Sequence, residues 1–237
     1  MKRLLLVFAH PDDESFSCGG TVAKYADAGW HVDLICGTSS DIRQKELQKA
    51  GMILGIHSIT FLGYQDGTLA SQTPGELEDI VYKKMEELVP DAVITMDTTG
   101  INNDPDHVKM CFTATYAFQK YAAWIEEKLK DQEDAAQNFP KLFYTSLPES
   151  LVEYLKKKKS LPAESFSKPW RGTPDKKITT VINITEFADT KKQALASYTS
   201  AQEYMVQPMV DHEYYILRMQ GTTEVFMGKN DHVANNL

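Results

Sequence analysis

Short apolar segments alternate with amphipathic segments through the first hundred residues, and this alternation constrains the fold most strongly. Apolar runs at residues 4–9, 30–36, 59–62 and 92–96 are typical of buried strands. Between them, residues 21–28, 41–54 and 76–88 have helical periodicity, and Gly29, Gly55 and Pro90 follow their ends. Strands that alternate with helices predict a mostly parallel sheet with helices on both faces.

The second half is less regular. We expect a helix over residues 107–130, a polar loop at 131–140, a helix at 187–205, and strands at 142–145, 178–184, 214–219 and 223–227. Residues 161–175 are rich in Pro, Ser and Lys; they form either a mobile flap over the site or a plain surface connection. We therefore predict one α/β domain over residues 1–237, a three-layer Rossmann-like fold with extra C-terminal strands.

Charge and cysteine content exclude several classes of protein. The formal net charge is −8, which argues against a general nucleic-acid role. We interpret the basic run at 156–159 as a solvated helix face or loop and expect no membrane attachment. The apolar run at 4–9 is too short for a secretory signal or a membrane span. Three widely spaced cysteines are typical of buried thiols in a cytoplasmic protein: Cys18, Cys36 and Cys111.

The densest chemical signal follows the first predicted strand. His10 and the three carboxylates of residues 12–14 stand at its carboxyl end, where ligands bind in open parallel sheets. Unpaired polar groups at a buried position are costly, and a divalent metal such as zinc would pair with them. Two alternatives are that the acids cap the next helix, or that they form the acidic pair of a magnesium-binding receiver domain. Neither alternative uses His10.

A second polar segment, residues 97–107, follows the fourth predicted strand. His107 opens the next helix, and we expect Asp106 to cap that helix or to orient the histidine. If the first and fourth strands are neighbours, His10, Asp13 and His107 meet in one crevice. Two histidines and one carboxylate leave a fourth position open, as in catalytic zinc sites.

These segments resemble the PIG-L/LmbE family of zinc-dependent N-deacetylases, and the resemblance spans most of the chain. The sequence Ala-His-Pro-Asp-Asp-Glu at 9–14 is intact, and Asp-Pro-Asp-His-Val stands at 104–108, where the family has His-Pro-Asp-His-Val. Further matching positions are Arg43, Glu46-Leu47, Leu54-Gly55, 62–67, Ala194-Leu195, Ser200 and Gln202.

The resemblance implies roles for particular residues. The zinc ligands would be His10, Asp13 and His107. Asp12 would be the general base, and Arg43 and Asp66 would lie in the sugar pocket. Arg43 suits an anionic aglycone, although a helix cation paired with Glu46 is an equal alternative. Asp104 replaces the family's first histidine, so the general acid is either Asp104 or Asp12.

The resemblance also implies a function. We expect zinc-dependent removal of the N-acetyl group from a GlcNAc-containing small molecule, N-acetylglucosaminyl-malate of bacillithiol biosynthesis by preference. Iron(II) is the alternative metal. The alternative activities are a thiol-conjugate amidase and a deacetylase of another amino sugar. The alternative outside enzymes is a sugar-binding regulatory protein that has lost catalysis, an option suggested by Asp104. We expect a closed homo-oligomer whose partner is the amino-sugar substrate.

Overall fold

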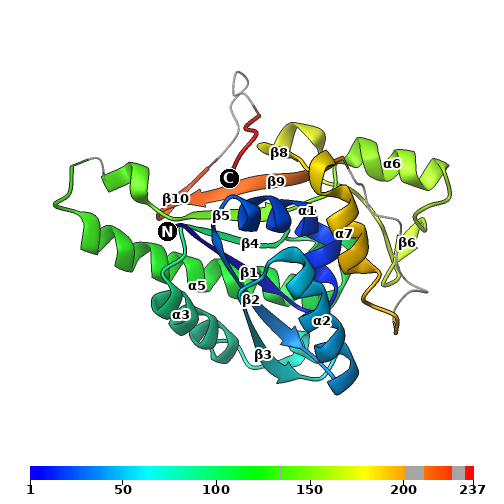
Figure 1. Ribbon diagram of the computed structural model, residues 1–237, viewed down its shortest axis with the longest axis horizontal. Helices are drawn as coiled ribbons and strands as arrows, with labels where there is room; N and C mark the ends of the chain where they lie inside the picture. Colours follow the sequence, from blue (N-terminus) through cyan, green and yellow to red (C-terminus); the bar gives the residue numbers. More distant parts are fainter. Residues whose placement is uncertain (134, 201–210, 226–232) are drawn as a thin grey trace.

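One mixed sheet with helices on both faces forms the framework of the chain (Figure 1). The computed structural model describes residues 1–133, 135–200, 211–225 and 233–237. The strand order is β10-β9-β5-β4-β1-β2-β3, and β8 pairs with β9. The predicted α/β fold with a mostly parallel sheet and additional C-terminal strands is therefore confirmed.

The five strands nearest the N-terminus run parallel, and β9 closes the sheet in the antiparallel direction. The parallel strands are β1 (Arg3–Phe8), β2 (His31–Thr38), β3 (Ser58–Tyr64), β4 (Ala92–Met96) and β5 (Lys141–Thr145). The C-terminal strands are β8 (Thr180–Asn183), β9 (His212–Gln220) and β10 (Thr223–Glu224). Strands β1 and β4 are neighbours, as the predicted crevice requires.

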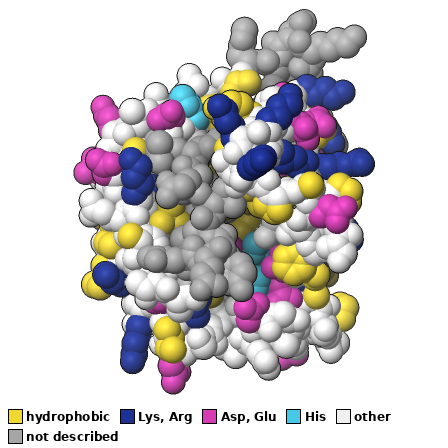
Figure 2. All heavy atoms as spheres, turned by 90° about the vertical axis from the view of Figure 1, so that its right-hand side faces the viewer, with side chains coloured by type: hydrophobic (Ala, Val, Ile, Leu, Met, Phe, Trp, Pro, Cys, Tyr) yellow, Lys and Arg dark blue, Asp and Glu magenta, His cyan; other side chains and the backbone are white. Residues whose placement is uncertain are grey.

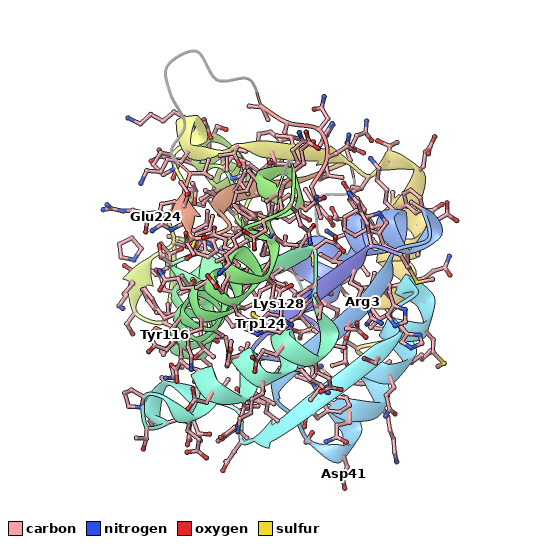
Figure 3. All side chains as sticks on the ribbon, turned by 90° about the vertical axis from the view of Figure 1, so that its left-hand side faces the viewer. Arg3, Asp41, Tyr116, Trp124, Lys128 and Glu224 are labelled. Atoms are coloured by element: carbon pink, nitrogen blue, oxygen red, sulfur yellow. The ribbon has the colours of Figure 1, made fainter. Side chains whose placement is uncertain are left out.

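Helices cover the two faces in separate groups. Helix α1 (Asp13–Asp27), α2 (Asp41–Leu54) and α7 (Ala188–Leu195) pack together on one face. Helix α3 (Glu76–Leu88) packs along α5 (Pro105–Leu129) on the other. Figure 3 views the molecule from the left-hand side of Figure 1. There Lys128 Nζ of α5 lies 3.5 Å from the ring centroid of Trp124. β1 and β4, buried throughout apart from Arg3, form the middle layer.

Helix α1 begins eight residues earlier than predicted, and the start expected at Thr21 was wrong. The helix is kinked at Cys18, where φ is −147°. Beyond the kink, the N–H groups of Gly20 and Thr21 donate to the buried carboxylate of Glu213, at 2.9 Å and 2.8 Å. Gly19 and Gly20, which precede the predicted start, therefore lie inside the helix. A Cβ at Gly20 would lie 2.5 Å from a side-chain atom of Ile184, so this glycine permits close packing.

The other differences lie in the second half. Helix α6 (Glu149–Lys157) was not predicted, and the basic run lies at and beyond its exposed C-terminal end. Helix α7 ends at Leu195, short of the predicted helix at 187–205, of which 201–205 lie outside the described residues. The same is true of Gln202, and of 226–227 in the last predicted strand. Short helices complete the chain: α4 (Gly100–Asn103), Leu69–Ser71, Ala135–Asn138, Asp175–Lys177 and Thr185–Phe187.

The irregular segment at 161–175 contains a small hairpin of β6 (Glu164–Ser165) and β7 (Lys168–Pro169). Residues of this hairpin line the cavity described below, so the segment lies over the site. All three cysteines are buried and free. Among the described helices, none combines the length and apolar character that a membrane crossing needs.

Candidate metal centre

A cavity of about 910 Å³ opens beyond the carboxyl ends of the parallel strands. Its floor is formed by the loop after β1 and the loop after β4, the position at which open α/β sheets bind ligands. On the face shown in Figure 2, a histidine side chain lies in a hollow beside carboxylates and hydrophobic side chains. The cavity is within the range of roughly 300–1,000 Å³ that small-molecule sites occupy.

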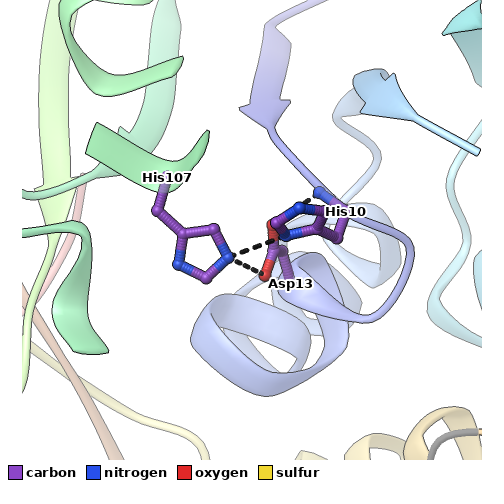
Figure 4. A group of neighbouring side chains, drawn as sticks. All are labelled: His10, Asp13 and His107. Carbon is purple, nitrogen blue, oxygen red and sulfur yellow. Dashed lines mark hydrogen bonds and ion pairs between the residues drawn. The ribbon is translucent and has the colours of Figure 1, made fainter. Parts of the chain in front are cut away.

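His10, Asp13 and His107 converge in this cavity (Figure 4). His10 Nδ1 lies 3.0 Å from His107 Nε2, and His107 Nε2 lies 3.2 Å from Asp13 Oδ1. His10 Nδ1 lies 3.9 Å from Asp13 Oδ2. One ligand atom from each residue falls within 4.8 Å of the others, so the structure brings the three predicted metal ligands together.

Local backbone contacts set the position of Asp13. Its Oδ2 accepts hydrogen bonds from the backbone N–H groups of Ala9, at 3.1 Å, and His10, at 2.8 Å. These donors belong to the chain entering the loop, so Asp13 does not cap the helix that it begins. Its other oxygen, Oδ1, is left to face His107.

The hydrogen-bond partners of the two imidazoles decide which nitrogen atoms can bind a metal. His107 Nδ1 lies 2.9 Å from the backbone oxygen of Gly100, which can only accept, so Nδ1 carries the proton. His107 Nε2 then presents a lone pair to the cluster. His10 Nε2 lies 3.1 Å from Asp66 Oδ1 and 3.6 Å from Asp106 Oδ2, ion-pair distances without a regular hydrogen bond. These carboxylates favour a proton on Nε2, which leaves the His10 Nδ1 lone pair facing that of His107.

Two ring nitrogens 3.0 Å apart share either a proton or a metal cation, and the electrostatics of the cluster favour a positive charge there. Burial by itself would lower the pKa of His10, but the carboxylates of Asp106, Asp66, Asp13 and Asp104 outweigh it and raise that pKa to about 11. Burial likewise opposes protonation of His107, whereas Asp13 raises its pKa to about 8. The donor set of two imidazoles and one carboxylate fits a divalent metal such as zinc.

The loop after β4 reaches the cluster through a strained turn. Gly100, Ile101 and Asn103 have φ values of 64°, 62° and 68°, and for a β-branched residue such as Ile101 this is a costly conformation. Asp97 supports the turn because its Oδ1 accepts from the backbone of Thr99 and Ile101, at 2.9 Å and 3.2 Å. Its Oδ2 accepts from Ser146 and Thr173, which come from distant parts of the chain.

Asp12, the predicted base, also has an unusual backbone, with φ 114°, and its side chain caps no helix. The carboxylate Oδ2 accepts from Arg43 Nη2 at 2.5 Å. Burial and the neighbouring Asp13 raise the pKa of Asp12, Arg43 lowers it, and the result is a pKa of about 7. Such a carboxyl can exchange a proton near neutral pH.

Arg43 has features of both roles that the sequence left open. It lines the cavity, and it pairs with Glu46 Oε2 at 3.2 Å as well as with Asp12. It also donates to the backbone oxygen of Pro11, and its guanidinium carbon lies 5.1 Å from the ring centroid of Tyr198. Arg43 is therefore a partly buried group that holds the first loop; the pairing with Glu46 expected of a helix cation is present, but the side chain is not exposed.

Asp66 and Asp104 both line the cavity, in different settings. The side chain of Asp66 is 84% exposed and meets the cluster through His10. Asp104 is the N-cap of α5 and accepts from the backbone N–H of Asp106 at 2.8 Å. The expectation that Asp106 caps this helix or orients His107 was therefore wrong. Asp104 Oδ2 lies 4.0 Å from His107 Nε2, so it remains at the edge of the cluster.

The roles of two acidic residues of the site were not recognised from the sequence. Asp106 is buried, faces His10, and accepts from the backbone of Gly67 and Ala70. Asp97 is the buried acid that supports the strained turn. A signal for Asp97 existed, since an acid directly after a buried apolar strand needs partners, but the sequence does not name those partners.

The N-terminal half of the chain matches a known protein family. Residues 5–118 match the PIG-L family, described as GlcNAc-PI de-N-acetylase. The match contains both loops and all of the residues considered above for the metal and for proton transfer.

Two relatives are deacetylases by name. A probable N-acetyl-alpha-D-glucosaminyl L-malate deacetylase 2 from Bacillus anthracis is 36% identical over 124 residues, 45% of this chain and 54% of that protein. The aligned part thus spans about half of that relative. A 1D-myo-inositol 2-acetamido-2-deoxy-alpha-D-glucopyranoside deacetylase 1 from Catenulispora acidiphila is 28% identical, over 83% of this chain and 74% of that protein.

A solved structure shares the fold over nearly the whole chain. The 4-carboxy-2-hydroxymuconate hydratase from Pseudomonas putida KT2440 has a TM-score of 0.61 and 18% identity, covering 96% of this chain and 100% of that one. That similarity concerns the fold alone, because proteins of one fold perform unrelated reactions.

Proposed function

Because residues 5–118 match the PIG-L family model and contain both loops of the site, we propose that this chain is a metal-dependent deacetylase of a GlcNAc-containing small molecule. The observation that carries the proposal is the approach of His10 Nδ1 to His107 Nε2, 3.0 Å apart, beside the Asp13 carboxylate. His10, Asp13 and His107 would hold the metal, zinc by preference and iron(II) as the alternative. When bound, the metal supplies Lewis acidity towards the amide carbonyl and the attacking water.

Asp12 has the properties of the general base. It lies next to the metal-binding cluster, lines the cavity, and has a pKa raised to about 7. It would accept the proton of the attacking water and return it to the departing amine, giving acetate and a free glucosamine nitrogen. Arg43 would keep its carboxylate in position. Asp104 is the second candidate for the acid, although its Oδ1 is already used by the α5 cap.

The nature of the sugar conjugate is proposed from the relatives. N-acetylglucosaminyl-malate is the preferred substrate, because the Bacillus anthracis relative is named for it and Arg43 offers a cation at the cavity wall. The inositol conjugate named for the Catenulispora relative is the second candidate. Asp66, at the exposed end of the cavity, would bind sugar hydroxyl groups. A sugar-binding protein without catalysis would have no use for the paired and pKa-shifted Asp12.

Release of free amine tests the proposal. We expect the zinc-loaded protein to deacetylate N-acetylglucosaminyl-malate, and a chelator to abolish the activity, with recovery when zinc is returned. The inositol conjugate should be measured in parallel. Turnover that a chelator leaves unchanged would contradict the metal assignment. The same preparations, analysed by sedimentation, test the proposed homo-oligomer.

A further inference from the structure

The cavity has two walls of different chemical character, one on each side of the metal-binding cluster. Strand β1, which leads to His10 and Asp13, lies between β2 and β4 in the sheet. One wall follows β2 and β3, and the other follows β4 and β5. A substrate whose scissile amide lies at the cluster therefore extends towards both walls.

The wall after β2 and β3 is polar. It contains Ser39, Ser40, Arg43, Gln65 and Asp66. These side chains supply donors and acceptors of both charge types, as the hydroxyl groups of a sugar require. The amine side of the substrate, which carries the sugar, fits this wall.

The wall formed by the segment after β4 and the hairpin after α6, with Phe16 of α1 beside it, has apolar side chains next to the polar Asn102, Asp104 and Ser165. Its apolar members are Phe16, Met96, Ile101, Pro162, Phe166 and Trp170. Met96, Ile101 and Trp170 are 1%, 7% and 6% exposed, so they form a packed surface at the base. Phe166 is 51% exposed, a large apolar side chain at the cavity without full cover among the described residues.

Backbone contacts build this wall from two separate loops. Asn103, after β4, donates through Nδ2 to the backbone oxygens of Ser165 and Pro169, at 3.4 Å and 3.3 Å. The tip of the hairpin has Phe166 and Ser167 at φ 50° and 58°, where Asn and Gly are the usual residues. A phenylalanine at such a position costs conformational energy, which a role for its ring in the cavity explains.

We propose that the wall formed by Phe16, Met96, Ile101, Pro162, Phe166 and Trp170 is an acyl subsite, and that the chain hydrolyses N-acyl glucosamine conjugates whose acyl group is an aliphatic chain longer than acetyl. The inference rests on the proposed function, because it places the scissile amide at the cluster with the sugar on the polar wall. An acetyl group has one methyl to bury, whereas the Phe166 ring at this wall has about half of its surface exposed, above the packed Met96 and Ile101. The reaction is hydrolysis of the amide bond: water gives its hydroxyl to the acyl carbon and its proton to the amine.

A series of acyl chains on one sugar tests the subsite. With the zinc-loaded protein we expect kcat/KM for N-butyrylglucosaminyl-malate to exceed that for the N-acetyl compound about tenfold, because two more methylene groups leave water. A wild-type protein that prefers acetyl would overturn the subsite and leave the deacetylase proposal intact. Absence of amine from every member of the series would contradict the proposed function itself.

The Phe166→Ala variant tests whether the wall that contains Phe166 binds the acyl chain. We expect this variant to reduce the butyryl-to-acetyl ratio of kcat/KM about tenfold. Tyr154→Ala removes a ring of similar exposure on α6, away from the cavity, and should leave the ratio unchanged. An equal loss for both substrates in Phe166→Ala would show that the ring stacks on the sugar, and would overturn the acyl assignment.

Binding affinities test the subsite independently of turnover. In the Asp12→Asn background, which keeps the zinc site and lacks turnover, calorimetry should show the hexanoyl compound N-hexanoylglucosamine binding at least about tenfold more tightly than N-acetylglucosamine when the wall is of wild-type sequence. Phe166→Ala in the same background should lose this preference. Equal affinities with the wild-type wall would overturn the proposal whatever the outcome of the kinetic series.

Discussion

The loop after β1 and the loop after β4 supply side chains to the same cluster, but different kinds of contact hold them. After β1, Asp13 bonds to the backbone of Ala9 and His10, a few residues away in the sequence. After β4, Asp97 collects donors that include Ser146 and Thr173, 49 and 76 residues away. The position of Asp13 is therefore set by local contacts, whereas the contacts of Asp97 depend on the assembly of the whole domain.

The two loops also differ in which residues have a strained backbone conformation. In the first loop the unusual backbone is at Asp12, and Arg43 of α2 binds its carboxylate. In the second loop the unusual backbone conformation is at Gly100, Ile101 and Asn103. This conformation positions the backbone oxygen of Gly100, which orients His107. Strained residues in both loops lie at the cavity, where such conformations concentrate in proteins. The difference predicts that changes in the second loop affect stability and metal binding together.

Loss of one ligand from each loop is expected to have the largest effect. His10→Ala and His107→Ala should each reduce bound zinc from about one equivalent to less than about 0.1, because two ligands do not retain a zinc ion against a chelating buffer. Elemental analysis after dialysis measures the zinc content. His57→Ala, which changes a histidine stacked on His31 away from the cavity, is the control. Full zinc content in His107→Ala would exclude the second loop from the metal site.

Asp12→Asn should lower kcat about 1,000-fold while zinc content stays at one equivalent, since the amide keeps the shape of the side chain and cannot accept the proton. Amine release under saturating substrate, with metal analysis of the same sample, measures both quantities. Asp104→Asn provides the comparison from the second loop. If Asp104→Asn causes the greater loss in kcat, the principal proton transfer belongs to the loop after β4.

Asp97→Ala should weaken zinc binding about tenfold to 100-fold and lower the free energy of unfolding by about 3 kcal/mol, because it leaves several buried donors without an acceptor. Competition with a chromogenic chelator and urea denaturation measure the two effects. The control Asp91→Ala removes a carboxylate that accepts from the backbone of Arg3 at the opposite end of the sheet. An effect of Asp97→Ala no larger than that of Asp91→Ala would mean that the second loop holds its shape locally.

Arg43→Gln should change the pH dependence, the smallest of the four effects. Asp12 acts as a base when ionised, so activity is lost as the pH falls through its pKa. Arg43 lowers that pKa, and its removal should therefore move the acidic limb of kcat/KM about one pH unit higher. Lys45→Gln, an exposed neighbour on α2, is the control. If the acidic limb of kcat/KM does not move in Arg43→Gln, that limb reflects the ionisation of a group other than Asp12.

Much of the framework was predictable because the responsible interactions are periodic or local. Helices α2 and α3 and strand β4 have the predicted bounds, since their apolar spacing and terminal residues agree with each other. The start of α1 was wrong because Gly19 and Gly20 resemble a break, while the partners of the kink, Glu213 and Ile184, come from the far end of the chain. The end of α7 at Leu195 likewise has no marker in the local pattern.

The alternating layers of the fold and the dense group of polar residues after β1 could be predicted from the amino-acid order, because both depend on neighbours in the chain. The sequence also named the three residues that converge on the metal-binding cluster. Only the tertiary structure decided that Asp106 faces His10, that Asp97 supports the turn beneath His107, and that Arg43 binds Asp12. The physical reason is that a carboxylate or guanidinium at a buried position must find partners, and the packing of distant segments decides which partners it meets.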